Sequence, residues 1–216
     1  MASGKPHALL FDCDGTLVDT MPMYLKSWTL TLAELDLPPL PAERFYSLGG
    51  MPVGKIFEML LAEAGNTTIT VEKCEETKRK HHQGLVERGE GVPPGIDVVI
   101  EFARKYKQLG VPVAVCSSGW RDHVIGNLEA CGALDLFTEV VTADDPDLKN
   151  GKPAPDIWLI AARRLNVPIE NCVGFEDAPL GMESLQAAGV KFAADVTVWA
   201  DYPRNVEARA REAAAA

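Results

Sequence analysis

A short apolar run that leads directly into two aspartates restricts the fold of this chain more than any other feature. Residues 8–11 read Ala-Leu-Leu-Phe and are followed at once by Asp12 and Asp14. An uninterrupted apolar run of this length is typical of a strand that is buried on both faces of a parallel sheet. Open sheets of this kind place their chemistry at the carboxyl ends of the strands. The sequence therefore predicts an α/β fold with a functional site at the two aspartates.

Strand and helix patterns alternate after residue 90, which predicts a Rossmann-like parallel sheet with helices on both faces. Further strands are expected at 111–116, 139–142, 172–176 and 190–193, with one more edge strand at 196–199. Helices are expected up to residue 108 and at 122–131, 154–165, 180–188 and 202–216.

Residues 18–89 contain helical patterns and no pattern of a buried strand. The helices are expected at 24–35, 42–48, 53–64 and 71–87, separated by proline, glycine and Asn66-Thr67-Thr68. The breaker-rich segment 89–95 marks the return to the sheet pattern. We therefore expect two domains, which are a core of residues 1–17 and 90–216 and an α-helical insert of residues 18–89.

Composition narrows the classes of partner. The chain has 216 residues and a net charge of −10, which argues against nucleic acid or an anionic membrane surface as the partner. The five cysteines are odd in number and scattered, as in a reduced intracellular protein. The expected location is the cytoplasm, with an organelle as the alternative if a transit peptide has been removed. We expect a monomer or a weak homodimer.

Asp12 and Asp14 are two positions apart, so their side chains point to the same side of an extended segment. Two neighbouring carboxylates repel each other unless a cation neutralises them. Mg²⁺ fits this role because it takes oxygen ligands and is commonly shared with a substrate phosphate. Gly15 allows a tight turn beside the carboxylates, and Thr16 adds a hydroxyl there.

The segment from Asp12 to Thr20 reads DCDGTLVDT and resembles the first motif of the haloacid dehalogenase-like superfamily, most of whose members are Mg²⁺-dependent phosphohydrolases. Residues 113–119, VAVCSSG, resemble the second motif, and residues 152–156, KPAPD, resemble the third. Residues 174–181, GFEDAPLG, match the fourth. The motifs occur in the family's order and span the expected core. The helical insert resembles the cap of the branch that contains β-phosphoglucomutase and many sugar phosphatases.

The resemblance assigns catalytic roles to residues of the first three motifs. Asp12 is the expected nucleophile, which forms an aspartyl-phosphate, and Asp14 is the expected acid and base for the leaving alkoxide and the water. Lys152 would neutralise the nucleophile and the phosphoryl group. Ser117 and Ser118 are expected to hold phosphoryl oxygens, although a simple turn or helix cap also explains a serine there.

The resemblance also implies a metal site and contacts in the cap. Mg²⁺ would be held by Asp12, by the backbone carbonyl of Asp14 and by Asp177. Glu176 would be either a second ligand or an outer group that holds a metal-bound water. In the cap, the Gly-rich turn with Gly50 and the following Lys55 are expected to contact the substrate. A solvated surface lysine is the alternative for Lys55.

The predicted function is Mg²⁺-dependent hydrolysis of a phosphate monoester of a small metabolite, a sugar or polyol phosphate. A β-phosphoglucomutase-like mutase is the alternative, but that group carries a histidine at the position that aligns with Tyr24. A non-catalytic scaffold for protein binding is an alternative of another class. It would be expected to lose Asp12, Asp14, Lys152 or Asp177, and all four are present.

Overall fold

The computed structural model describes residues 7–90 and 92–215 and divides into two compact units. The sheet unit comprises Met1–Asp19 and Pro94–Ala216, and the helical unit comprises Thr20–Pro93. These borders lie two and four residues beyond the expected ones. The reason is that Val18 still forms a bridge with Gly95, and the Asp19 N–H donates to the carbonyl of Pro94. The segments where the chain leaves and re-enters the sheet unit, residues 18–19 and 94–95, therefore belong to that unit.

A five-stranded parallel sheet forms the centre of the sheet unit, with the strand order β3-β2-β1-β4-β5. The first strand lies in the middle, where Leu10 pairs with Ala114 on one side and with Gly174 on the other. This central position explains why the run at 8–11 is wholly apolar. The strands are β1 (Ala8–Phe11), β2 (Val113–Cys116), β3 (Glu139–Val141), β4 (Cys172–Glu176) and β5 (Phe192–Asp195).

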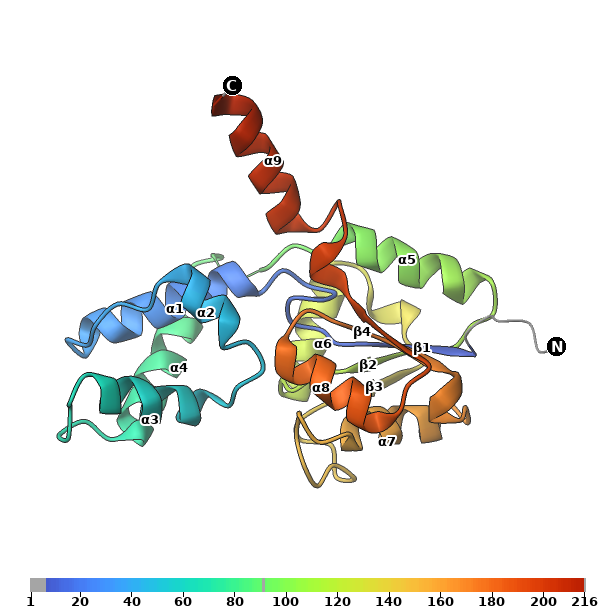
Figure 1. Cartoon of the computed structure of the whole chain (residues 1–216), viewed down its shortest axis with the longest axis horizontal. Coiled ribbons are helices and arrows are strands. Elements are labelled where there is room, and N and C mark those ends of the chain that lie inside the picture. The colour runs from blue at the N-terminus through green and yellow to red at the C-terminus, as the bar shows by residue number, and fades with distance from the viewer. Residues whose placement is uncertain (1–6, 91, 216) are drawn as a thin grey trace. The chain divides into compact units, whose positions relative to one another are not determined.

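Helices cover both faces of this sheet (Figure 1). Alternate residues of β1 belong to different cores because side chains alternate along a strand. Leu9 and Phe11 pack with α5 and α6, whereas Ala8 and Leu10 pack with α7 and α8. The predicted α/β class is confirmed. The helices are α5 (Asp97–Gln108), α6 (Arg121–Ala130), α7 (Asp156–Arg164), α8 (Pro179–Ala188) and α9 (Pro203–Ala215).

The edge strand expected at 196–199 is wrong. The chain there forms a short 3-10 helix, Val196–Val198. The Asp195 carboxylate accepts hydrogen bonds from the N–H of Thr197 at 2.8 Å and from its hydroxyl at 2.6 Å. A backbone N–H that is bound by a side chain in this way is no longer available to a strand ladder. The last strand also lies two residues later than predicted.

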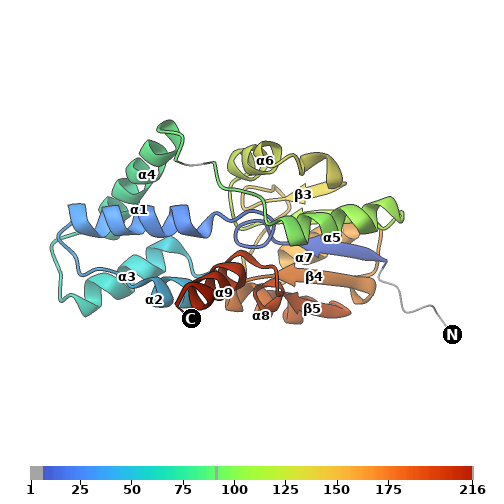
Figure 2. The same cartoon turned by 90° about the horizontal axis from the view of Figure 1, so that it is seen from above.

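The helical unit consists of helices and irregular segments, with no strand in its described residues (Figure 2). Its first helix begins earlier than predicted because Pro22 fits the first turn of a helix. The rings of Trp28 and Phe57 pack together in the core of this unit, with centroids 4.4 Å apart and planes tilted by 36°. The helices are α1 (Met21–Glu34), α2 (Ala42–Ser47), α3 (Val53–Glu63) and α4 (Val71–Glu87).

Among the described residues, none of the helices combines the length and the apolar character needed to cross a membrane.

We predict that Gly174→Ala destabilises the protein by about 1–3 kcal/mol, the usual cost of overpacking a core. A Cβ atom at Gly174 on β4 would lie 2.0 Å from Leu185 Cδ2 on α8. Gly126→Ala on α6 is the matched control because its Cβ would meet nothing within 4 Å. The control should stabilise the helix by about 0.5–1 kcal/mol. Equal midpoints of urea unfolding for the two variants would contradict the packing described here.

Candidate active site

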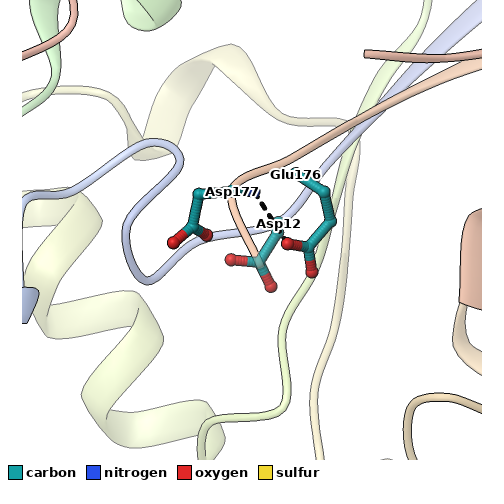
Figure 3. Close-up of side chains that lie close together, drawn as sticks. All are labelled: Asp12, Glu176 and Asp177. Atoms are coloured by element: carbon teal, nitrogen blue, oxygen red, sulfur yellow. Dashed lines mark hydrogen bonds between the residues drawn. The ribbon is translucent and has the colours of Figure 1, made fainter. Parts of the chain in front are cut away.

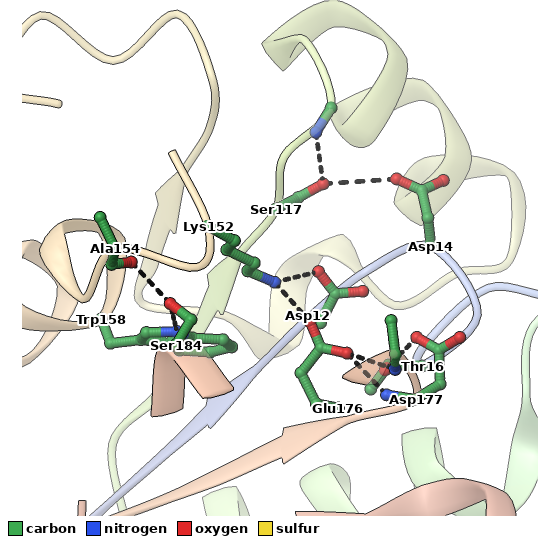
Figure 4. A network of polar contacts seen from close by, with 12 residues as sticks. Asp12, Asp14, Thr16, Ser117, Lys152, Ala154, Trp158, Glu176, Asp177 and Ser184 are labelled. Atoms are coloured by element: carbon green, nitrogen blue, oxygen red, sulfur yellow. Dashed lines mark hydrogen bonds and ion pairs between the residues drawn. The ribbon is translucent and has the colours of Figure 1, made fainter. Parts of the chain in front are cut away.

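The four sequence motifs converge at the carboxyl ends of the central strands (Figure 4). Asp12 and Asp14 follow β1, and Ser117 follows β2. Lys152 comes from the loop between β3 and α7, and Glu176 and Asp177 lie at the end of β4. Parallel strands bring these ends to one edge of the sheet, which is why residues far apart in sequence meet here.

Three carboxylates form the centre of the site (Figure 3). Oxygen atoms of Asp12, Glu176 and Asp177 lie within 4.8 Å of one another. Asp12 is only 6% exposed and Glu176 only 2%. Burial, opposed by Lys152 but reinforced by Glu176 and Asp14, raises the pKa of Asp12 to about 8. Burial and the charges of Glu176 and Asp12 likewise raise the pKa of Asp177 well above its usual value.

Lys152 supplies the positive charge in this cluster. Its Nζ donates to Asp12 Oδ1 at 2.6 Å and to Glu176 Oε1 at 2.7 Å. Burial alone would lower the pKa of this amine, but the two carboxylates outweigh burial and raise it. The ammonium ion is therefore retained at neutral pH. The raised pKa values of Asp12 and Asp177 show that one ammonium does not fully neutralise the three acidic groups, so a hard cation such as Mg²⁺, which takes oxygen ligands, would stabilise their ionised forms.

Both oxygens of Glu176 accept hydrogen bonds from the protein. Oε1 binds Lys152, whereas Oε2 accepts from the N–H groups of Asp177 at 2.8 Å and Ala178 at 2.7 Å. Helix α8 approaches this carboxylate so closely that a Cβ atom at Gly181 would lie 1.7 Å from Oε1. Glu176 thus fixes the turn that presents Asp177.

The turn after β1 is held in place from two sides. Gly15 has φ +87°, and a Cβ atom there would lie 2.3 Å from Asp177 Oδ2, so no other residue fits. The Thr16 hydroxyl donates to Asp177 Oδ1 at 3.2 Å. The hydroxyl of Tyr202 donates to the Gly15 carbonyl at 2.8 Å. Burial, together with the charge of Asp177, raises the pKa of Tyr202. Sequence reasoning missed Tyr202 because a tyrosine in a charged tail gives no signal of a contact across 187 positions.

Of the two serines expected to hold the phosphoryl group, only Ser117 lies among the site residues. Its hydroxyl donates to Asp14 Oδ2 at 3.3 Å and accepts from the N–H of Gly119 at 2.9 Å. Ser117 is fully buried, whereas Ser118 is exposed. Successive residues of an extended segment point in opposite directions, which explains the difference.

The loop that carries Lys152 is anchored at its start. The guanidinium of Arg164 donates to both oxygens of Asp145, at 2.7 and 2.8 Å, and to Asp147 at 3.0 Å. Paired charge-assisted bonds of this kind are the stronger ones in proteins. Hydrogen bonding to Arg164, which outweighs partial burial, lowers the pKa of Asp145.

The two residues expected to contact the substrate from the insert belong to the helical unit. Gly50 lies in an exposed turn with φ +82°. Lys55 is 66% exposed at its side chain and forms an ion pair with Glu58, one turn further along α3, at 2.8 Å. This pairing favours the solvated-lysine alternative for Lys55. The substrate contacts of both residues stay predictions.

Lys78 is a candidate functional residue of the helical unit that the sequence analysis did not identify. Its Nζ lies 5.5 Å from the ring centre of Tyr24 and 5.6 Å from that of Trp28. Burial lowers its pKa, and no carboxylate of the described residues pairs with it. The residue occurs in the run KRKHH, which is typical of a solvated helix face and so concealed it.

Comparison with known proteins agrees with this geometry. A family model described as haloacid dehalogenase-like hydrolase matches residues 9–195. The chain is 31% identical to a fructose-1-phosphate phosphatase of Escherichia coli, over 84% of this chain and 92% of the relative. It is 29% identical to a probable pseudouridine-5'-phosphatase of Saccharomyces cerevisiae, over 91% of this chain and 83% of the relative.

Two solved structures share the fold. A predicted phosphoglycolate phosphatase from Haemophilus somnus has a TM-score of 0.74 at 20% identity, over 89% of this chain and 85% of that one. A β-phosphoglucomutase from Clostridium difficile has a TM-score of 0.69 at 20% identity, over 94% and 99% of the two chains. With its four motifs gathered at one edge of the sheet and its match over residues 9–195, the chain belongs to the haloacid dehalogenase-like hydrolases.

Proposed function

We propose that the protein is a Mg²⁺-dependent phosphatase that hydrolyses a sugar or polyol phosphate through an aspartyl-phosphate on Asp12. The observation that carries this proposal is the buried Lys152 ammonium between Asp12 and Glu176, beside Asp177. Family membership and the named phosphatases among the relatives confirm the expected enzyme class, a phosphoric monoester hydrolase. Relatives named for fructose 1-phosphate and for phosphorylated carbohydrates support a sugar phosphate as the substrate.

The proposed chemistry divides hydrolysis into two displacements at phosphorus. An oxygen of Asp12 attacks phosphorus, and the bond between phosphorus and the leaving alkoxide breaks. Asp14 gives a proton to the oxygen of the alkoxide. Asp14 then takes a proton from water, which attacks phosphorus, releases phosphate and regenerates the Asp12 carboxylate. Lys152 and Ser117 bind the phosphoryl oxygens while negative charge builds on them.

The acidic cluster fits a bound Mg²⁺. Asp12, the Asp14 carbonyl and Asp177 would hold the ion, and it would neutralise phosphoryl oxygens when bound. Glu176 takes the outer role in this proposal because protein donors already occupy both of its oxygens. Its function would be to orient Lys152 and Asp177.

A phosphosugar mutase is the second candidate because of one observation on α4. Tyr24 aligns with the position at which the mutase branch carries a histidine. The centroid of the His82 ring lies 5.5 Å from that of the Tyr24 ring. An imidazole is thus present near that position, although it comes from another helix. Water remains the proposed acceptor because residues 21–24 are mostly apolar.

We predict that Asp12→Asn keeps the fold and lowers kcat by at least about 10³, because an amide cannot form the acyl-phosphate. Phosphate release from p-nitrophenyl phosphate measures the effect. Asp135→Asn, at an exposed aspartate of the same unit, is the matched control and should retain wild-type turnover. Near-native turnover by Asp12→Asn would rule out this nucleophile.

Removal of the metal tests the ion directly. Excess EDTA should stop turnover, and added Mg²⁺ should restore it. Ca²⁺ prefers more ligands at longer distances, so it should bind without supporting the reaction. Asp177→Asn should raise the Mg²⁺ concentration needed for half-maximal rate. Activity that persists unchanged in EDTA would contradict the proposed cofactor.

Phosphorus NMR separates the two candidate functions. The substrates are β-glucose 1-phosphate and a trace of the 1,6-bisphosphate. A phosphatase should form little glucose 6-phosphate from them, and any phosphate that leaves the sugar should appear as inorganic phosphate. Rapid conversion to glucose 6-phosphate without free phosphate would identify a mutase instead. In a mutase that uses the imidazole beside Tyr24, His82→Ala should abolish the conversion to glucose 6-phosphate.

A further inference from the structure

The Lys152 ammonium has a third neighbour besides its two carboxylates. Its Nζ lies 4.5 Å from the centre of the Trp158 ring (Figure 4). Trp158 is completely buried, and the Lys152 side chain is 3% exposed. An ammonium group has three N–H donors, and two of them go to Asp12 and Glu176. The indole face is thus a third neighbour of the ion, beside the two carboxylates that accept its hydrogen bonds.

The indole ring is itself tied in place by a chain of hydrogen bonds. Trp158 Nε1 donates to Ser184 Oγ at 2.8 Å, and the Ser184 hydroxyl donates to the carbonyl of Ala154 at 2.6 Å. Ala154 lies two residues after Lys152, so the chain returns to the loop that carries the lysine. Ser184 lies on α8, which begins immediately after the acidic motif. One serine therefore links the lysine loop, α7 and α8.

We propose that Trp158 is a positioning residue for Lys152, and that Ser184 fixes the ring in the orientation this requires. This inference rests on the proposed function, in which Lys152 binds the phosphoryl group that arrives at Asp12. A π face attracts a cation through its electron density and offers no lone pair. It can hold the ammonium in place without accepting the third N–H as a lone pair would, so that this N–H stays available to a phosphoryl oxygen. A carboxylate or water in the same place would accept that N–H.

The effect of a substitution on kcat distinguishes a positioning role for Trp158 from ordinary core packing. Trp158 does belong to the core between the sheet, α7 and α8. A residue that only fills this space would affect the free energy of unfolding and leave turnover by the folded protein unchanged. A positioning residue would affect kcat more than KM in protein that is fully folded.

Three variants in the full chain test the proposal. Trp158→Phe keeps an aromatic face, Trp158→Leu removes it, and Ser184→Ala breaks the hydrogen-bond chain. With p-nitrophenyl phosphate and saturating Mg²⁺, Trp158→Leu should lose at least about fivefold in kcat, with KM changed less than about twofold. Trp158→Phe should retain most of kcat. Trp199→Leu is the matched control, because Trp199 packs on the rings of Phe102 and Phe175 in the same unit. It should lower stability and retain wild-type kcat.

A spectroscopic readout does not depend on turnover. The Trp158 indole N–H resonance in a ¹H–¹⁵N spectrum, assigned by its loss in Trp158→Phe, should move when Lys152→Met removes the ammonium. Lys149→Met, an exposed lysine of the same loop, should leave that resonance in place. Ser184→Ala should speed exchange of the indole proton with solvent.

Each outcome decides one question. Wild-type kcat in folded Trp158→Leu, an equal loss in Trp158→Phe, or an unmoved resonance in Lys152→Met would overturn the positioning role. Absence of phosphate release by the wild-type protein with Mg²⁺, across a panel of phosphate monoesters, would instead refute the proposed function. The resonance shift would still test the contact between the ammonium and the ring in that case.

Discussion

The burial of one ammonium ion among acidic groups is the interaction on which the site depends. Lys152 joins the loop before α7 to the ends of β1 and β4 through Asp12 and Glu176. Removing one partner of such a pair typically costs about 3–5 kcal/mol because a buried charge is left uncompensated. The fold therefore has to hold the lysine loop firmly, and it does so through Arg164 at one end and Ser184 at the other.

Local chemistry made the central architecture predictable. The apolar run at 8–11 indicated a strand buried on both faces, and it is the middle strand of the sheet. The motifs predicted which residues meet at the strand ends, because parallel strands bring their carboxyl ends together. The edge strand at 196–199 failed since a single side chain, that of Asp195, diverts the backbone, and apolar periodicity does not register such a bond.

The partners of the site residues were less predictable because they depend on contacts between distant elements. Trp158 and Ser184 each read as ordinary helix residues, and only the packing of α7 on α8 brings them together. The place of Lys55 after a Gly-rich turn predicts a substrate contact, whereas no sequence pattern singles out Lys78. The structure shows Lys55 paired with Glu58 and Lys78 against two aromatic rings. A sequence pattern gives the charge of a lysine but not its counter-ion.

The hydroxyl of Tyr202 ties the C-terminal segment to the turn after β1 by a hydrogen bond to the Gly15 carbonyl. The family match ends at residue 195, seven positions before this tyrosine. A chain trimmed at that boundary would keep all four motifs yet leave the buried Gly15 carbonyl without its donor. Domain borders taken from family resemblance would therefore shorten this enzyme too far. Any attachment that replaces the C-terminal segment needs to leave Tyr202 in place rather than begin directly after the sheet.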